Sequence, residues 1–350
     1  MTPKNNAFPH ELNNNNKHKI FDLAFELSLQ KYLGRIDALP QSRLCAADKN
    51  LAKFEADLEV WDLIAVAVKH SAAVYKDIHA QQDYQGYWIK PTTVINHIKA
   101  TSIEVVDIYG YSVVVVAIRG SASLDDWFLN LNGDPIAAGI EDVFDDTHRW
   151  HRGFLDSFRA SEGGIADGIQ KVTTKYPHAC RILFTGHSAG GAIAQLCYNS
   201  CSIESSTIAK AIKAFNQINC VTFGAPPIST IPITPHTGSG VFLSVINEGD
   251  PVVLAQKEFI KAILSVYFLS KEDWDAKCSL GFAIPPAECH ISGTCIVLRD
   301  SNEDGEEEVL EAVEVPASLV ERTFFSNFLV HVMSLYCRRI DSLVLAAKSN

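Results

Sequence analysis

Apolar residues recur every three or four positions in two early segments, which predicts two helices. These are FDLAFELSLQKYL at 21–33 and WDLIAVAVKHSAAVY at 61–75. Such spacing places the apolar side chains on one face of a helix, and that face has to be buried. Both helices are therefore expected to pack against a flat surface.

The segments that follow have the pattern of strands. SIEVVDIYG at 102–110 and YSVVVVAIRG at 111–120 are β-branched runs that meet at a Tyr-Gly turn signal. A hairpin or an adjacent pair of strands is typical of such runs.

Further along, short and almost wholly apolar runs alternate with helical patterns. They are RILFTG at 181–186, NCVTFGAP at 219–226 and VFLSVINEGD at 241–250. Continuous apolar strands between helices indicate a largely parallel sheet that is covered on both faces. The fold class expected is therefore α/β, with a mostly parallel central sheet flanked by helices.

The last part of the chain predicts a hairpin and then a helix. CIVLRD at 295–300 and EEEVLEAVEV at 306–315 are the expected hairpin strands, and FFSNFLVHVMSLYCRRIDSLVLA at 324–346 is the expected closing helix. Residues 1–17 are rich in Asn and Lys and lack apolar periodicity, so they are expected to be a disordered tail. Residues 18–350 are expected to form a single domain.

Composition narrows the classes of function. The chain has 350 residues, 47% of them hydrophobic, and a formal net charge of −11. This charge argues against nucleic-acid binding, because an acidic protein offers no basic surface to the phosphates of a nucleic-acid backbone. The acidic segment 301–315 is expected to be a solvated hairpin rather than a partner site.

Cysteine usage and hydropathy indicate an intracellular protein. Nine cysteines are scattered without the paired spacing that zinc sites require, so reduced thiols and no bound metal are expected. The N-terminus lacks an apolar signal region, and the longest apolar runs, such as SVVVVAI at 112–118, have the length of a strand. These features predict a cytoplasmic location and no transmembrane segment.

The candidate chemistry centres on Ser188, in the G-x-S-x-G stretch at 186–190. The motif alone is weak evidence, but here it follows an apolar strand and opens the helical pattern AGGAIAQLCYNS. That strand, turn and helix are the setting of a nucleophile elbow, in which glycines leave room for close packing. A serine there needs a base and an orienting acid.

Spacing leaves the choice of acid and base open. In doubly wound hydrolases the order is serine, acid and histidine, each near a strand end. Asp250 directly follows an apolar strand, and Glu248 would serve the same chemistry. His236 precedes the strand that carries Asp250, which is too early, whereas His290 and His331 both fit the order.

Five stretches together resemble the fungal-type, or class 3, lipase family. They are VVVVAIRGSASLDDWFLNL at 113–131, HRGFLDSF at 151–158, FTGHSAGGAIAQL at 184–196, VTFGAPP at 221–227 and VINEGDPVV at 245–253. They occur in the family's order over roughly 61–336. The resemblance implies an α/β-hydrolase fold and hydrolysis of carboxylic esters, with acylglycerols as the first substrate class. A phospholipase, an esterase for soluble substrates and a non-catalytic lipase-like binding or signalling protein are the alternatives.

The resemblance also assigns roles to residues. Ser188 falls on the nucleophile, Asp250 on the acid, and His331, in HVMSLY, on the base, although Val330 stands where the family often has Asp. HISGTCIVL, which begins at His290, is similar to a structural strand start of the family. No metal or organic cofactor is needed for this chemistry.

The same resemblance implies an oxyanion hole and a lid. The backbone N–H of Ser121, after Arg-Gly, would join that of Ala189. Apolar residues at i, i+3, i+4 and i+7 predict a short amphipathic helix near 123–131. The resemblance makes this helix a lid over an acyl site, which implies transient contact with a lipid surface. Its apolar residues are Leu124, Trp127, Phe128 and Leu131.

Overall fold

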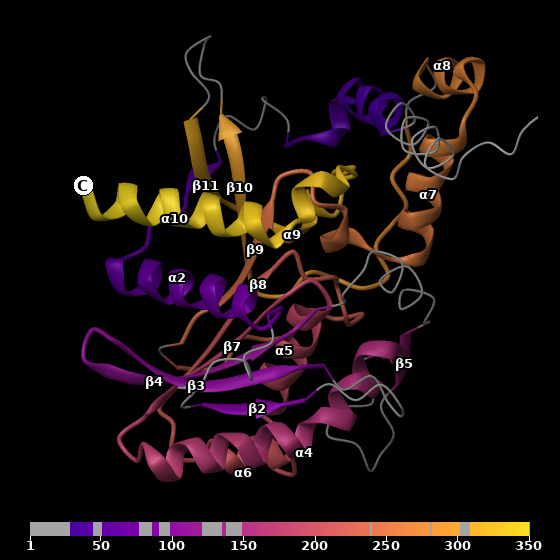
Figure 1. Ribbon diagram of the computed structural model, residues 1–350. Coiled ribbons are helices and arrows are strands. Elements are labelled where there is room, and N and C mark those ends of the chain that lie inside the picture. Colours follow the sequence, from indigo (N-terminus) through magenta and orange to yellow (C-terminus); the bar gives the residue numbers. More distant parts are fainter. Residues whose placement is uncertain are drawn as a thin grey trace, which may run out of the picture.

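A computed structural model gives the structure of this chain. It describes residues 29–44, 51–76, 86–90, 99–120, 135–137, 149–238, 240–279, 282–301 and 309–349. Within these ranges nine strands form one sheet, in the order β1-β11-β10-β9-β8-β7-β4-β3-β2 (Figure 1). The strands are β1 (Ala52–Lys53), β2 (Tyr87–Ile89), β3 (Thr101–Ile108), β4 (Tyr111–Ile118), β7 (Arg181–His187), β8 (Gln217–Phe223), β9 (Phe242–Asn247), β10 (Thr294–Ser301) and β11 (Val309–Val315).

The centre of the sheet is parallel and both of its edges are antiparallel. Strands β4, β7, β8, β9 and β10 pair in parallel. The predicted hairpin between β3 and β4 is confirmed, and its two-residue loop, Tyr109 and Gly110, has φ values of 50° and 78°. Positive φ at both loop positions is the turn that matches the twist of hairpin strands. The predicted late hairpin is also confirmed, as β10 pairs antiparallel with β11.

Helices cover both faces of the sheet. One face carries α2 (Leu58–Ala73) and α10 (Met333–Ser349), which lie side by side, and the other carries α4 (Arg152–Lys175), α5 (Ala189–Ser200) and α6 (Thr207–Ala211) (Figure 1). Consecutive strand residues enter different cores: Val114 packs toward α4 and α5, and Val115 toward α2 and α10. This burial of both faces explains why the central strands are continuously apolar.

A third apolar cluster lies at one end of the sheet. It contains residues of α7 (Lys257–Phe268) and α8 (Lys271–Ser279), of the segment 320–325, and of the N-terminal segment 32–44. The first predicted helix is described over residues 29–37, where Tyr32 and Ile36 are buried one turn apart. The predicted disordered tail, 1–17, lies outside the described residues.

The predicted closing helix begins later than expected. The pattern predicted a helix from Phe324, whereas residues 324–327 are not helical, a 3₁₀ turn spans Phe328–His331, and α10 starts at Met333. Residues 324–327 are not helical because backbone N–H groups at both ends of this stretch donate to carbonyls of distant segments. The N–H of Phe324 donates to the carbonyl of Gln41, and the N–H of Asn327 donates to the carbonyl of Gly249.

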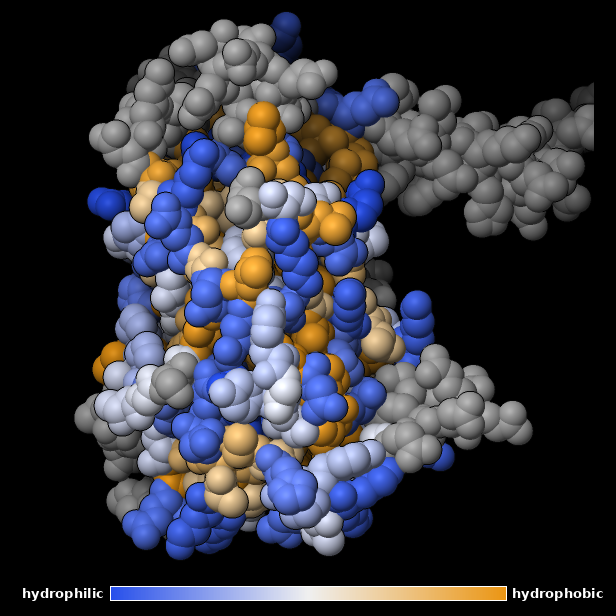
Figure 2. Space-filling model, turned by 90° about the vertical axis from the view of Figure 1, so that its left-hand side faces the viewer, coloured by the Kyte–Doolittle hydropathy of each residue, from blue (hydrophilic) through white to orange (hydrophobic). Residues whose placement is uncertain are grey.

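Two short strands, β5 (Pro135–Ala137) and β6 (Arg149–His151), pair with each other. The remaining described elements are the four-residue helix α9 (Ala317–Val320) and two 3₁₀ helices, Pro40–Ser42 and Pro251–Leu254. On the side of the molecule shown in Figure 2, hydrophilic and apolar side chains are interspersed. In the described part of the chain, no helix has the length and apolarity needed to cross a membrane. The same residues hold no group of three side chains that would bind a metal ion. The seven cysteines described there are free thiols.

Candidate active site

Ser188 lies at the sharp turn between β7 and α5, as predicted. Its φ and ψ are 58° and −133°, a conformation that residues with a side chain rarely adopt. Strain of this kind costs about 1–3 kcal/mol and persists only where the surroundings impose it. Here the Ser188 N–H donates to the carbonyl of Phe223 at 2.9 Å, which ties the turn to the end of β8.

Glycines allow the backbone to pack closely around this turn. A Cβ atom added at Gly186 would lie 2.6 Å from the carbonyl oxygen of Gly190 and 2.7 Å from the nitrogen of Gly191. One added at Gly190 would lie 2.8 Å from the carbonyl carbon of Arg119 and 2.9 Å from the nitrogen of Gly120. The start of α5 therefore sits directly on the end of β4, and side chains at these positions would push the two apart.

The start of α5 offers hydrogen-bond donors beside Ser188. Ala189 is the first residue of the helix, so its N–H has no acceptor within the helix. Ser121, the other predicted donor, lies outside the described residues, as do the predicted lid residues Leu124, Trp127, Phe128 and Leu131. The residue before Ser121 is described: a Cβ at Gly120 would lie 3.3 Å from Cβ of Ser188. The chain thus enters the predicted oxyanion loop next to the serine.

Asp250 and His331 meet in the interior, 81 residues apart in sequence. Nδ1 of His331 lies 3.1 Å from Oδ1 and 2.9 Å from Oδ2 of Asp250. Since a carboxylate only accepts, Nδ1 carries the proton and Nε2 remains as an acceptor. Asp250 is 0% exposed and His331 7%, so water competes little for this contact.

Two further groups fix the Asp250 carboxylate. The N–H of Val252 donates to Oδ1 at 2.9 Å, and the hydroxyl of Tyr336 donates to Oδ2 at 2.6 Å. Burial and the Asp250 charge raise the pKa of Tyr336 well above its usual value, which keeps this hydroxyl a donor. The N–H of Asn247 in turn donates to the Tyr336 oxygen at 3.0 Å.

Gly224, which the sequence analysis did not single out, lies against the same group. Its φ is 53°, and a Cβ there would lie 2.6 Å from Oδ2 of Asp250, 2.9 Å from the Tyr336 hydroxyl and 3.1 Å from Nδ1 of His331. The Asp250 and His331 contact therefore requires glycine at this position. The signals in the sequence were the place of Gly224 directly after an apolar strand and its presence in the stretch VTFGAPP.

His331, the predicted base, lies beside the elbow. The imidazole rings of His331 and His187 stack with centroids 4.5 Å apart and planes at 29°, and His187 is the residue before Ser188. Nε2 of His187 also contacts the carbonyl of His331 at 2.7 Å. The structure thus joins Asp250 to His331 directly, and it stacks His331 on the residue that precedes Ser188.

The alternative acid and bases are engaged elsewhere. Glu248 accepts the N–H of Leu44 at 2.9 Å. Nδ1 of His290 lies 3.2 Å from both carboxylate oxygens of Glu321. His236 contacts the carbonyl of Tyr198 through Nε2 at 2.8 Å, and the hydroxyl of Ser202 through Nδ1. None of these contacts involves Ser188.

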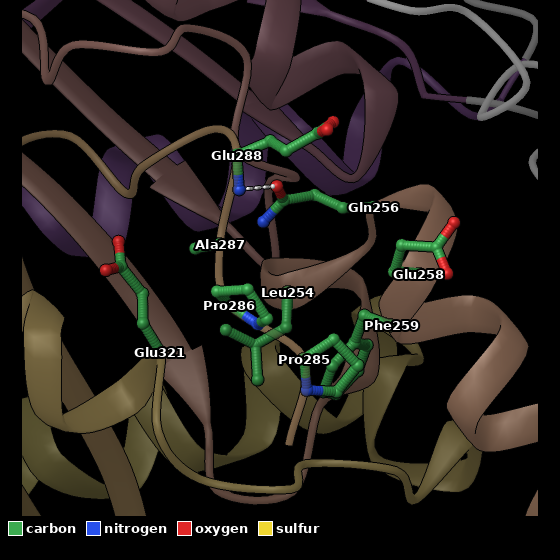
Figure 3. Close-up of a pocket in the computed structure, with 9 residues that line it drawn as sticks. All are labelled: Leu254, Gln256, Glu258, Phe259, Pro285, Pro286, Ala287, Glu288 and Glu321. Atoms are coloured by element: carbon green, nitrogen blue, oxygen red, sulfur yellow. Dashed lines mark hydrogen bonds between the residues drawn. The ribbon is translucent and has the colours of Figure 1, made fainter. Parts of the chain in front are cut away.

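A small hollow lies beside the segment that follows Asp250 (Figure 3). Leu254, Phe259 and two prolines form its apolar wall, and Gln256 accepts the N–H of Glu288 at 2.6 Å. Its volume of about 20 Å³ suits a single water molecule and is too small for an ester substrate. A larger cavity of about 220 Å³ lies where β7 and β8 begin, at the end of the sheet opposite Ser188.

Comparisons with solved structures return fungal lipases. A lipase of Yarrowia lipolytica superposes with a TM-score of 0.49 at 14% identity, covering 81% of this chain and 92% of that one. A triacylglycerol lipase described as having a serine protease triad in its catalytic centre superposes with a TM-score of 0.48 at 17% identity, covering 79% and 94%. The α/β-hydrolase fold itself is evident from the parallel sheet, the elbow after β7 and the order of Ser188, Asp250 and His331.

Sequence comparison gives a family. A lipase of Rhizomucor miehei is 30% identical over 88 residues, which is 24% of this chain and 22% of that protein. The aligned region therefore spans about a fifth of that relative. The family model "Lipase (class 3)" matches residues 115–258, which include the elbow and Asp250. Over these residues, which make up less than half of its length, the chain is similar to the class 3 lipase family.

Proposed function

We propose that this protein hydrolyses carboxylic esters of lipids, with acylglycerols as the principal substrates. The observation that carries the proposal is the contact between His331 and the buried Asp250, beside a serine held in a strained elbow. Such a serine is weakly nucleophilic on its own and needs an adjacent base. His331 is that base, and Asp250 holds its proton on Nδ1.

The reaction proceeds in two halves. Oγ of Ser188 attacks the ester carbonyl while Nε2 of His331 accepts the hydroxyl proton, and the tetrahedral intermediate collapses as His331 returns that proton to the leaving alcohol. Water then attacks the acyl-enzyme, again losing a proton to His331. Release of Ser188 yields the free fatty acid and restores the neutral imidazole.

Charge on the carbonyl oxygen is stabilised by backbone donors. The free N–H of Ala189, at the positive end of the α5 dipole, is one donor, and the N–H of Ser121 is the other. Loss of one such donor typically costs about 2.7–4 kcal/mol of transition-state stabilisation. The amphipathic segment 123–131 acts as a lid that opens at a lipid surface.

The test compares Ser188→Ala with the wild type on a nitrophenyl acyl ester and with a fluorophosphonate probe. We expect the wild type to turn over the ester and to be labelled at Ser188, because only an activated serine reacts with the probe. Ser188→Ala is expected to lose both signals with an unchanged melting temperature. Ser205→Ala, an exposed serine, is the matched control and keeps both.

Three outcomes would contradict the proposal. An unreactive wild type would point to a non-catalytic binding protein, and activity retained in Ser188→Ala would place the chemistry elsewhere. Faster hydrolysis of phospholipid vesicles, or of short soluble esters, than of an acylglycerol emulsion would shift the substrate class.

A further inference from the structure

A series of polar contacts connects Tyr75, His187 and the backbone of His331, and His187 is the residue before the candidate nucleophile. The hydroxyl of Tyr75, just after α2, lies 3.0 Å from Nδ1 of His187. Nε2 of His187 lies 2.7 Å from the backbone carbonyl of His331. One buried imidazole therefore bridges the end of α2 and the backbone of the candidate base.

The chemistry of the partners fixes the direction of these hydrogen bonds. A carbonyl oxygen only accepts, so Nε2 of His187 carries the proton and donates to His331. Nδ1 is then an acceptor, and the Tyr75 hydroxyl donates to it. Burial, with a smaller contribution from His331, lowers the pKa of His187 to about 3, and burial raises that of Tyr75 to about 12. Near neutral pH, His187 is therefore a neutral ring whose single proton is on Nε2, and the Tyr75 hydroxyl keeps its proton.

At its other end, this series of polar contacts reaches Arg119 and Gly120, the residues that lead to the predicted oxyanion loop. A Cβ atom added at Gly120 would lie 2.6 Å from the carbonyl oxygen of His187 and would collide with the Tyr75 hydroxyl. The backbone of Gly120 also hydrogen-bonds that hydroxyl. The guanidinium of Arg119 lies 5.7 Å from the centre of the Tyr75 ring. Tyr75 therefore contacts the backbone one residue before Ser121.

We propose that Tyr75 and His187 form a positioning pair for the candidate active site. Through its N–H, His187 holds the backbone of His331 so that the imidazole faces Ser188, and Tyr75 locks His187 in the tautomer that this requires. The contact with Gly120 ties the same unit to the entry of the oxyanion loop. This assignment rests on the proposed function, because positioning matters only where His331 acts as a base.

The stacked rings add an electrostatic reason for a neutral His187. His331 becomes an imidazolium during each proton transfer, and a second cation 4.5 Å away would oppose that charge. A neutral ring instead presents a polarisable face. Among the described residues, Asp250 accepts from His331, and the ring centre of Tyr336 lies 5.7 Å from that of His187.

The test compares three variants for kcat and KM on a soluble ester. His187→Phe keeps an aromatic ring and loses the donor, whereas His187→Gln keeps an N–H that reaches the position of Nε2. Displacement of a reacting group by 1 Å costs about 100-fold in rate, so kcat is expected to fall by about 30- to 100-fold in His187→Phe, with little change in KM. His187→Gln is expected to recover most of that loss.

Tyr75→Phe is the mildest probe and supplies a coupling measurement. It is expected to lower kcat by about 3- to 10-fold in the wild type, and to have no further effect in His187→Gln, where the acceptor for the hydroxyl is gone. A merely structural role would instead lower the melting temperature, and the His187→Gln and Tyr75→Phe effects would be additive.

The outcomes separate this assignment from the proposed function. An inert wild type overturns both. An active wild type, with His187→Phe folded and within about threefold of its kcat, overturns the positioning pair alone, as does equal loss in His187→Phe and His187→Gln. Should His187→Phe fail to fold, the coupling between Tyr75→Phe and His187→Gln decides the question.

Discussion

Two carboxylates stand two residues apart after β9, and their surroundings give them different roles. Asp250 faces His331, Tyr336 and the N–H of Val252. Glu248 instead accepts the N–H of Leu44, and burial raises its pKa. Gly249, between them, has a φ of 92°, a turn that lets the two side chains leave the backbone toward different partners. Proximity in the sequence therefore says little about which carboxylate contacts His331.

Replacement of each carboxylate by its amide tests this division. Asp250→Asn is expected to lower kcat by about 10,000-fold, because the amide favours the wrong tautomer of His331 while it keeps the shape of the site. Glu248→Gln is expected to leave kcat unchanged, and it serves as the matched control. Steady-state rates on a soluble ester provide the measurement, and the reverse order of effects would reassign the acid.

Glu248→Gln also has an expected effect on stability. A carboxyl whose pKa is higher in the folded than in the unfolded chain makes the folded chain bind more protons, so stability falls as the pH rises through this range. The amide keeps an acceptor for Leu44 and removes the buried charge. Unfolding by urea is expected to show a more stable variant near pH 7, and no difference well below 4.5, the usual pKa of Glu. A variant less stable than the wild type near pH 7 would contradict this account.

At the scale of elements, the N-terminal segment 29–44 is hydrogen-bonded to the segment just before His331 and to the end of α7. The Tyr32 hydroxyl donates to the carbonyl of Ser326 at 2.8 Å. The guanidinium of Arg35, 6% exposed, donates to the carbonyls of Val266 and Leu269 at the end of α7. Cations at a helix C-terminus satisfy carbonyls that lack partners within the helix. This segment therefore completes the third apolar cluster.

Arg35→Met measures the contribution of that cap. The aliphatic stem is kept while the hydrogen bonds of the guanidinium to the carbonyls of Val266, Leu269 and Ser270 are lost, so the free energy of unfolding is expected to fall by about 1.5–3 kcal/mol. Arg43→Met removes an exposed arginine, 3.9 Å from Asp37, and is expected to cost at most about 0.5 kcal/mol. Denaturant midpoints of the two variants provide the comparison, and equal shifts would refute a capping role for Arg35.

The sequence pattern predicted correctly those elements whose signal lies within a few consecutive residues. The strands β7, β8 and β9 and the elbow at Ser188 were predicted because each is a continuous apolar run with a turn signal at its end. The start of the closing helix was wrong, since the contacts of Phe324 and Asn327 with distant carbonyls outweigh apolar periodicity. Tyr75 escaped prediction for the same reason: its partner, His187, lies 112 residues away.

At the scale of the whole molecule, a sheet covered on both faces buries thiols as ordinary apolar groups. Cys197 of α5 and Cys220 of β8 are both 0% exposed and belong to the same apolar cluster. Burial raises the pKa of each thiol well above its usual value. Because the thiolate is the reactive form, both cysteines are doubly protected in the folded chain, by burial and by protonation.

Alkylation of these two thiols is therefore expected to report unfolding. In the native protein near pH 8, Cys180, which is partly exposed, is expected to react with iodoacetamide well before Cys197 and Cys220, and peptide mass spectrometry resolves the three.

If these buried thiols react only after unfolding, Arg35→Met, which lowers the free energy of unfolding, speeds their modification and leaves the rate at Cys180 unchanged. Equal rates at all three sites in the native protein would show that the core between α5 and β8 opens locally. Acceleration at Cys197 and Cys220 would instead show that the segment 29–44 and the distant face of the sheet unfold as one cooperative unit.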